Sequence, residues 1–174
     1  MQSIILTGYM CVGKTTVGRA LAKRLGYTFY DLDWYIEERF HTKVSQIFAE
    51  KGEAHFRDLE RRMLHEVAEF ENVVVSCGGG TPCFFDNMDY MNHVGQVFYL
   101  KASPETILHH LSMSRGERPL LKDKTPKELR TFVAEQLSER EPFYEKARHV
   151  VDVNVLDSFD KIDIVVDHIC DMIP

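Results

Sequence analysis

Long apolar runs are absent from this sequence, and none approaches the roughly 20 residues that a membrane-spanning helix needs. The first ten residues, MQSIILTGYM, also lack a basic leader and a small-residue cleavage site, the two marks of a secretory signal. These absences argue against a membrane-bound or exported protein. We therefore expect a cytoplasmic protein without a targeting segment.

Paired cysteines and basic charge are lacking as well. Cys11, Cys77, Cys83 and Cys170 form no C-x-x-C pair, and a chain of this size needs no disulfides, so we expect reduced thiols. The chain has 21 Lys and Arg against 27 Asp and Glu, a formal net charge of -6 at pH 7. Because a nucleic-acid surface is normally basic, we expect no nucleic-acid partner.

The sequence also has no internal repeat or low-complexity stretch that would divide it. Its 174 residues, 44% hydrophobic and 28% charged, have the size and balance of one domain with its own core. We predict a single domain over residues 1–174. Within it, residues 113–124 are polar, contain Gly and Pro and show no periodicity, which favours a lid.

Short apolar runs and helical patterns alternate along the chain. Strands are expected at 3–7, 28–31, 72–77, 96–100 and 150–153. Helices are expected at 14–25, as two or three segments within 33–70, after Ser103-Pro104, and at 159–173. Strands separated by helices predict an α/β fold with a parallel, doubly wound sheet. Ligands of such sheets bind at the carboxyl ends of the strands.

A glycine-rich loop follows the first expected strand. Residues 8–15, Gly-Tyr-Met-Cys-Val-Gly-Lys-Thr, fit the pattern G-x-x-x-x-G-K-[ST] of a phosphate-binding P-loop. The glycines let backbone N–H groups and the following helix face one phosphate. Lys14 then reaches the β- and γ-phosphates, and the Thr15 hydroxyl faces Mg²⁺. The pattern predicts ATP binding by a kinase.

Polar residues end the second and third expected strands, beside the P-loop. Asp31 is expected to hold Mg²⁺ through water, while Asp33 orients the attacking hydroxyl. Asp33 could instead, or in addition, cap the helix that follows. Ser76 and the run Gly78-Gly79-Gly80 close the third strand, where glycines let a ligand approach the backbone, although a plain turn would also use them.

Taken together, six motifs resemble those of the shikimate kinases in order and spacing and cover nearly the whole chain. They are the P-loop, Asp31-Leu-Asp33, Phe56-Arg57-x-x-Glu60, Ser76-x-Gly78-Gly79-Gly80, Arg118-Pro119-Leu120-Leu121 and Arg140-x-x-x-Tyr144. The resemblance implies a nucleoside-monophosphate-kinase-like fold with five parallel strands in the order 2-3-1-4-5. It also implies transfer of the γ-phosphate of ATP to the 3-hydroxyl of shikimate, a step in aromatic amino acid (chorismate) biosynthesis.

The resemblance further implies roles for individual residues. The catalytic residues would be Lys14, Asp33 and Arg118. ATP and its phosphates would contact Gly8, Cys11, Val12, Gly13, Lys14, Thr15, Thr16 and Arg118. Shikimate would contact Asp33, Arg57, Gly78, Gly79, Gly80 and Arg140, with substrate-binding helices at about 33–61. The cofactor Mg²⁺ would contact Thr15 directly, and Asp31 and Ser76 through water.

The proposed substrate matches the chemistry of these side chains. Guanidinium groups bind a carboxylate in bidentate fashion, so Arg57 and Arg140 suit the carboxylate of shikimate. Glu60, one helical turn after Arg57, is placed to hold it. Phe48 and Phe56 are candidates for either a wall of the site or the core. A gluconate kinase and a silent nucleotide-binding module remain alternatives, and a monomer is expected.

Some positions depart from the family pattern. Cys11 stands where these kinases usually carry Gly or Ala, which predicts a modest sensitivity of activity to alkylation. Many relatives have an arginine facing adenine near His110 and Leu111, and their Asn-Arg after the last strand is Asn154-Val155 here. The adenine contacts are therefore not assigned, and Arg115 is a candidate.

Overall fold

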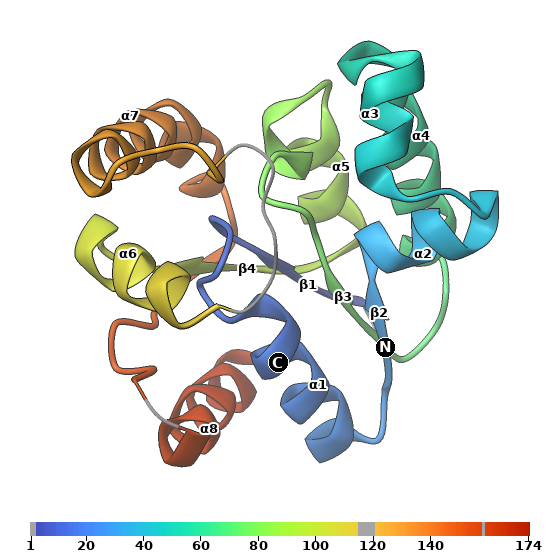
Figure 1. The fold of residues 1–174 in the computed structure, drawn as a ribbon. Coiled ribbons are helices and arrows are strands. Elements are labelled where there is room, and N and C mark those ends of the chain that lie inside the picture. Colours follow the sequence, from blue (N-terminus) through green and yellow to red (C-terminus); the bar gives the residue numbers. More distant parts are fainter. Residues whose placement is uncertain (1–2, 115–120, 158) are drawn as a thin grey trace.

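One parallel sheet runs through the part of the chain that the computed structural model describes, residues 3–114, 121–157 and 159–174 (Figure 1). Its strands lie in the order β2-β3-β1-β4-β5, and every neighbouring pair is parallel. The strands are β1 (Ser3–Thr7), β2 (Thr28–Asp31), β3 (Val73–Ser76), β4 (Gly95–Lys101) and β5 (His149–Asp152). This order confirms the expected α/β fold.

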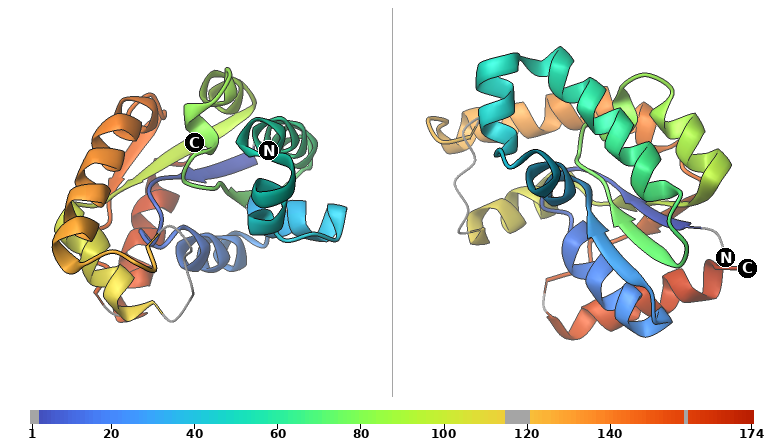
Figure 2. Two further views of the ribbon diagram at one scale, coloured as in Figure 1. Left: turned by 45° about the horizontal axis from the view of Figure 1, so that its top comes forward. Right: turned by 90° about the vertical axis from the view of Figure 1, so that its right-hand side faces the viewer.

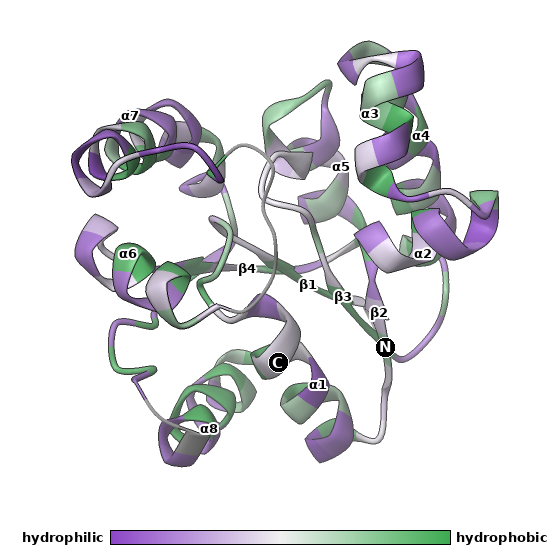
Figure 3. Cartoon of the chain, viewed as in Figure 1, coloured by the Kyte–Doolittle hydropathy of each residue, from purple (hydrophilic) through white to green (hydrophobic). Residues whose placement is uncertain are grey.

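The three central strands, β1, β3 and β4, supply buried residues of the hydrophobic core. Every residue of β1 and β3 is buried, as are the first six residues of β4, whereas the edge strands β2 and β5 are partly exposed. The uniformly apolar run Val73–Val75 is therefore the mark of a strand covered on both faces. Figure 3 shows the same division, with apolar strands at the centre and polar outer faces on the helices.

Helices cover both faces of the sheet (Figure 2). α1 and α8 pack side by side on one face, and α4, α5 and α7 lie on the other (Figures 1 and 2). The helices are α1 (Lys14–Leu25), α2 (Leu32–Phe40), α3 (Val44–Lys51), α4 (Glu53–Ala68), α5 (Asn87–Val94), α6 (Pro104–Met113), α7 (Pro126–Tyr144) and α8 (Ile162–Met172), with 3-10 turns at Thr81–Cys83 and Phe159–Lys161. None of the described helices is long and apolar enough to cross a membrane.

The helix predictions were partly right. Residues 33–70 form three helices, and Gly52 separates α3 from α4 with a φ of 84°, which a residue with a side chain rarely adopts. The sequence patterns did not single out α5 or α7.

The side chain that caps α2 belongs to Asp31, which accepts a hydrogen bond from the Trp34 N–H, so a capping role for Asp33 is wrong. Residues 115–120 of the expected lid lie outside the described residues.

Candidate functional site

The P-loop connects β1 to the N-terminus of α1. Gly8 has a φ of 144°, and a Cβ there would lie 2.6 Å from the Leu100 carbonyl oxygen, so the turn requires glycine. Gly13, with a φ of 104°, immediately precedes α1. Cys11 has a φ of 62° without being glycine, so the P-loop holds a residue with a side chain in the left-handed region, which costs it some strain.

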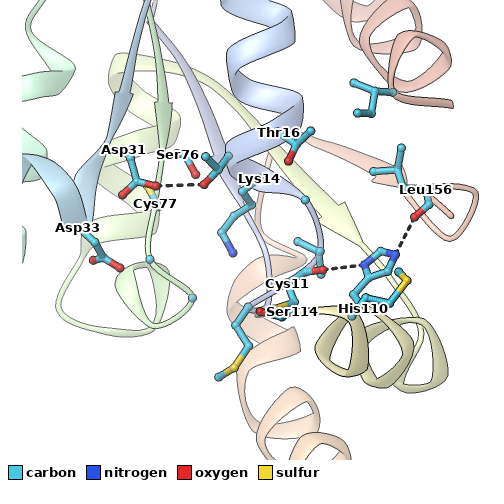
Figure 4. A pocket seen from close by; sticks show the side chains of 18 of the residues that line it. Cys11, Lys14, Thr16, Asp31, Asp33, Ser76, Cys77, His110, Ser114 and Leu156 are labelled. Carbon is cyan, nitrogen blue, oxygen red and sulfur yellow. Dashed lines mark hydrogen bonds between the residues drawn. The ribbon is translucent and has the colours of Figure 1, made fainter. Parts of the chain in front are cut away.

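Lys14 lies at the centre of the pocket and bonds to its own loop (Figure 4). Its Nζ donates to the carbonyl oxygens of Gly8 at 2.7 Å and Tyr9 at 2.8 Å. Burial lowers the pKa of Lys14 to about 8, and nearby Asp33 opposes that effect. A polyphosphate would supply the missing negative charge and stabilise the ammonium form.

Nucleotide binding should consequently be coupled to protonation of Lys14. At about pH 8.5 we expect uptake of roughly 0.5–0.8 proton per ATP analogue bound, because the phosphates raise the pKa of a lysine that is partly neutral in the free pocket. Calorimetry in two buffers with different ionisation enthalpies measures this uptake. Lys14→Arg, which stays charged, is the control, and equal uptake by both proteins would contradict the assignment.

Oxygen donors for a cation gather next to Lys14. The Thr15 hydroxyl donates to Asp31 Oδ2 at 3.1 Å, while Asp31 Oδ1 caps α2. Ser76 is the register partner of Asp31 in the sheet. Hydroxyl and carboxylate oxygens suit Mg²⁺, which usually keeps several waters and binds phosphate oxygens. Among the described residues no group of three or more His, Cys, Asp and Glu side chains is arranged to hold a metal ion by itself, so phosphates and water would complete the coordination.

Asp33 faces the pocket from the first turn of α2 (Figure 4). Burial, together with the negative charges of Glu60 and Asp31, raises the pKa of Asp33 to about 7, while Lys14 and Arg57 act in the opposite direction. A Cβ on Gly78 would lie 3.2 Å from Asp33 Oδ1, so the glycine leaves room for this carboxyl. Asp33 is thus close to half-protonated at neutral pH, a state suited to accepting a proton.

Arg57 is held inside the protein by a network on α4. Its Nη1 donates to Glu60 Oε1 at 2.9 Å, and the Thr81 hydroxyl donates to Glu60 Oε2 at 2.8 Å. The guanidinium also lies 4.1 Å from the centre of the Phe84 ring. A Cβ on Gly80 would be 2.5 Å from Arg57 Nη2, so only a residue without a side chain leaves room for the guanidinium. The predicted contact between Glu60 and Arg57 is confirmed.

Arg140 reaches the same glycine turn from α7. A Cβ on Gly79 would lie 3.2 Å from Arg140 Nη1, and the buried Tyr144, one turn later, donates to the Gly79 carbonyl oxygen. No carboxylate within the described residues forms a salt bridge with Arg140, whereas Arg57 has two such partners, Glu53 and Glu60. Of the two predicted clamps, Arg140 is the one without a salt bridge to a carboxylate of the described residues.

One pocket of about 660 Å³ unites most of the predicted residues (Figure 4). Its lining includes all of residues 10–16, Asp31, Asp33 and 76–79. Gly8, Arg57, Gly80 and Arg140 do not line it; Arg57 and Arg140 lie against the glycine turn 78–80. Arg118 and Arg115 are outside the described residues. The sequence reasoning missed Thr81 and the contacts of His110, because neither belongs to a local chemical pattern.

A P-loop at the carboxyl end of the central strand lies beside oxygen donors for a cation, a carboxyl of raised pKa and a pair of arginines. This combination is typical of a kinase of a small anionic metabolite. The family model described as "Shikimate kinase" matches residues 10–173. A shikimate kinase of Phocaeicola vulgatus is 52% identical over 96% of this chain and 95% of its own length. The chain belongs to the shikimate kinase family.

Solved structures agree with this assignment. The crystal structure of a shikimate kinase from Bacteroides thetaiotaomicron superimposes with a TM-score of 0.95 and 47% identity, covering 98% of this chain and 97% of the other. A shikimate kinase from Acinetobacter baumannii in complex with shikimate has a TM-score of 0.86 and 31% identity, covering 99% and 92%. The likeness therefore extends over nearly the whole chain.

Proposed function

We propose that this chain transfers the γ-phosphoryl group of ATP to the 3-hydroxyl of shikimate, giving shikimate 3-phosphate and ADP. The observation that carries the proposal is that Asp33 and Lys14 line the same pocket (Figure 4), and that Asp33 also lies against the glycine turn 78–80, which Arg57 and Arg140 contact. An acceptor held by Arg140 would present a hydroxyl to Asp33, opposite the γ-phosphate on Lys14. The acceptor hydroxyl would then be in line with the γ-phosphorus that it attacks.

Each residue has a definite task in the transfer. Asp33 orients the attacking hydroxyl and takes its proton as the bond from oxygen to phosphorus forms and the bond to the ADP oxygen breaks. Lys14 leaves its two loop carbonyls to neutralise phosphate oxygens. Mg²⁺ would be held by Thr15 and, through water, by Asp31 and Ser76, and would supply further charge neutralisation. Arg118 would close over the γ-phosphate, a role that rests on the family resemblance.

Arg57 and Arg140 would both bind the carboxylate of shikimate, but the protein holds their side chains differently. Arg140 supplies the guanidinium that has no salt bridge to a carboxylate of the described residues, and Arg57 is fixed by Glu60 and lies over the Phe84 ring. Phe48 packs against Phe56 with ring centres 4.6 Å apart, and both rings lie near the Arg57 guanidinium. This packing favours a supporting role for the two aromatics over direct contact with the substrate.

Release of ADP from Mg-ATP tests the function, with shikimate, gluconate and no acceptor compared side by side. We expect stimulation by shikimate alone. Stimulation by gluconate alone would retain the fold and the mechanism but change the substrate. ATP binding without turnover on either acceptor would instead indicate a silent nucleotide-binding module.

We further propose that the enzyme works as a cytoplasmic monomer. Among the described residues, the exposed large apolar side chains are spread over several elements, for example Trp34 on α2, Phe85 before α5 and Ile164 on α8. Light scattering on the purified protein should give the mass of one chain, and the mass of two chains would contradict the proposal. The ATP requirement agrees with a cytoplasmic location.

A further inference from the structure

The side chain of Glu60 lies between two hydrogen-bond donors that come from different elements. Its Oε1 accepts a hydrogen bond from Arg57 Nη1 at 2.9 Å, and its Oε2 accepts one from the Thr81 hydroxyl at 2.8 Å. Arg57 and Glu60 belong to α4, whereas Thr81 begins the 3-10 turn that follows the glycine turn 78–80. One carboxylate therefore connects the arginine to a hydroxyl that lies 21 positions after Glu60 in the chain.

Glu60 is the partner that fixes the direction of the Arg57 guanidinium. Its side chain is 1% exposed and contacts the arginine at 2.9 Å. The second carboxylate on the guanidinium belongs to Glu53, which is 57% exposed and lies 3.4 Å away. An exposed ion pair contributes little and leaves its side chains free to move, whereas a buried and fully bonded one is rigid. The orientation of Arg57 consequently depends on the orientation of Glu60.

Thr81 is itself fixed on its other side by Asn87. Both residues are fully buried, and Asn87 Nδ2 donates to the Thr81 carbonyl oxygen at 2.9 Å. The Thr81 N–H donates to the Gly78 carbonyl oxygen at 3.2 Å. A Cβ on Gly78 would lie 3.3 Å from Thr81 Oγ1 and 3.4 Å from Glu60 Oε2, so the glycine backbone packs directly against their hydrogen bond. The Thr81 hydroxyl is thus held in one place relative to Glu60.

Loss of the Thr81 hydroxyl would leave one oxygen of a buried carboxylate without a donor. Because such an oxygen is costly to keep in place, Glu60 would turn, and Arg57, bonded to its other oxygen, would move with it. The paired hydrogen bonds between a guanidinium and the carboxylate of a ligand require a defined geometry. A shift of Arg57 would therefore weaken the binding of a carboxylate while leaving the P-loop as it is.

We propose that Thr81 is a positioning residue for the acceptor substrate: by donating to Glu60, it holds the Arg57 guanidinium in the orientation that binds a carboxylate. Thr81 is fully buried, so it acts through Glu60 and Arg57 and not by touching the substrate. The inference rests on the proposed function, in that the acceptor is shikimate and Arg57 binds its carboxylate.

Calorimetry with shikimate tests this role in Thr81→Val, which replaces the hydroxyl with a methyl group of similar size. We expect Kd for shikimate to rise about tenfold, the scale of one hydrogen bond to a charged group. Kd for an ATP analogue should not change, because the P-loop has no part in this network.

Steady-state kinetics separate a role through Arg57 from a role through Asp33. Asp33 Oδ1 also borders Gly78, at 3.2 Å from a Cβ placed there. If Thr81 acts through Arg57, KM for shikimate rises in Thr81→Val while kcat is nearly unchanged, because the carboxylate is bound equally before and during the transfer. A lowered kcat with an unchanged Kd for shikimate would overturn the proposal.

Three comparisons separate positioning from folding stability. Thr81→Ser keeps the hydroxyl and should bind shikimate as the wild type does. Ser3→Ala removes another buried hydroxyl, which donates to the Ala68 carbonyl oxygen at the far end of α4, and should lower Tm without changing Kd for shikimate. The primary amide of shikimate lacks the charge that Arg57 binds, so the loss of affinity caused by Thr81→Val should be much smaller for this compound.

Other outcomes would contradict the role of Thr81. They are an unchanged Kd for shikimate in Thr81→Val, a serine variant that binds as weakly as the valine variant, and an equal loss of affinity for the amide. Should the valine variant not fold, Thr81→Ala, which cannot crowd the turn, takes its place in the same comparison with serine. A wild type that binds the ATP analogue but not shikimate would overturn the proposed function, and this inference with it.

Discussion

Asp33→Asn should lower kcat by about 10²- to 10⁴-fold while leaving the affinity for ATP unchanged. The amide retains the size of the carboxyl but cannot take the proton of the attacking hydroxyl. The nucleotide contacts of the P-loop do not involve this side chain, so their contribution remains. Steady-state kinetics with shikimate and calorimetry with an ATP analogue measure the two effects, and preserved turnover would reject the role of Asp33.

The same substitution should stabilise the folded protein at neutral and alkaline pH. Because burial raises the pKa of Asp33 to about 7, the folded state binds a proton that the unfolded chain has already lost above about pH 4. Stability from this group is therefore present below pH 4 and is lost as pH rises to about 7. We expect Asp33→Asn to gain about 1–2 kcal/mol at pH 8 and nothing at pH 4. Asp58→Asn, an exposed change on α4, is the control.

Arg140→Ala should weaken shikimate binding by about 2–5 kcal/mol, the range for removing one partner of a buried charge pair. The guanidinium has no salt bridge to a described carboxylate, so its loss leaves no internal charge unpaired and Tm should change little. Calorimetry with shikimate measures the first effect and thermal unfolding the second. Arg130→Ala, on the exposed face of the same helix, should alter neither. An unchanged Kd for shikimate would remove Arg140 from the site.

Arg57→Ala should differ from Arg140→Ala in its effect on folding stability. It should weaken shikimate binding over the same range, but it also leaves Glu60 buried without its partner. Breaking a buried ion pair in this way costs about 3–5 kcal/mol of folding stability, so Tm should fall as well. Glu60→Gln combined with Arg57→Ala should recover part of that stability without recovering shikimate affinity. A loss of stability in Arg140→Ala instead would show that the two roles are reversed.

The strands and the P-loop could be predicted from the sequence because their signals are local. The uniformly apolar runs at β1, β3 and β4 and the glycine spacing at 8–15 depend on neighbouring residues alone. α7 was not predicted because its buried side chains are few, Val133, Leu137 and Tyr144, in an otherwise polar helix. Its apolar periodicity is therefore weak, and contacts with the rest of the molecule stabilise it.

The sequence by itself determined the fold class, the phosphate-binding loop and the residue types of the site. The tertiary structure alone decided how residues of the same type differ: Asp31 caps α2 while the pKa of Asp33 is raised, and Arg57 is paired with Glu60 while Arg140 has no salt bridge to a described carboxylate. It also brought His110 to two carbonyls distant in the chain. These properties depend on burial and on contacts between remote segments, and such contacts leave no pattern in a single sequence.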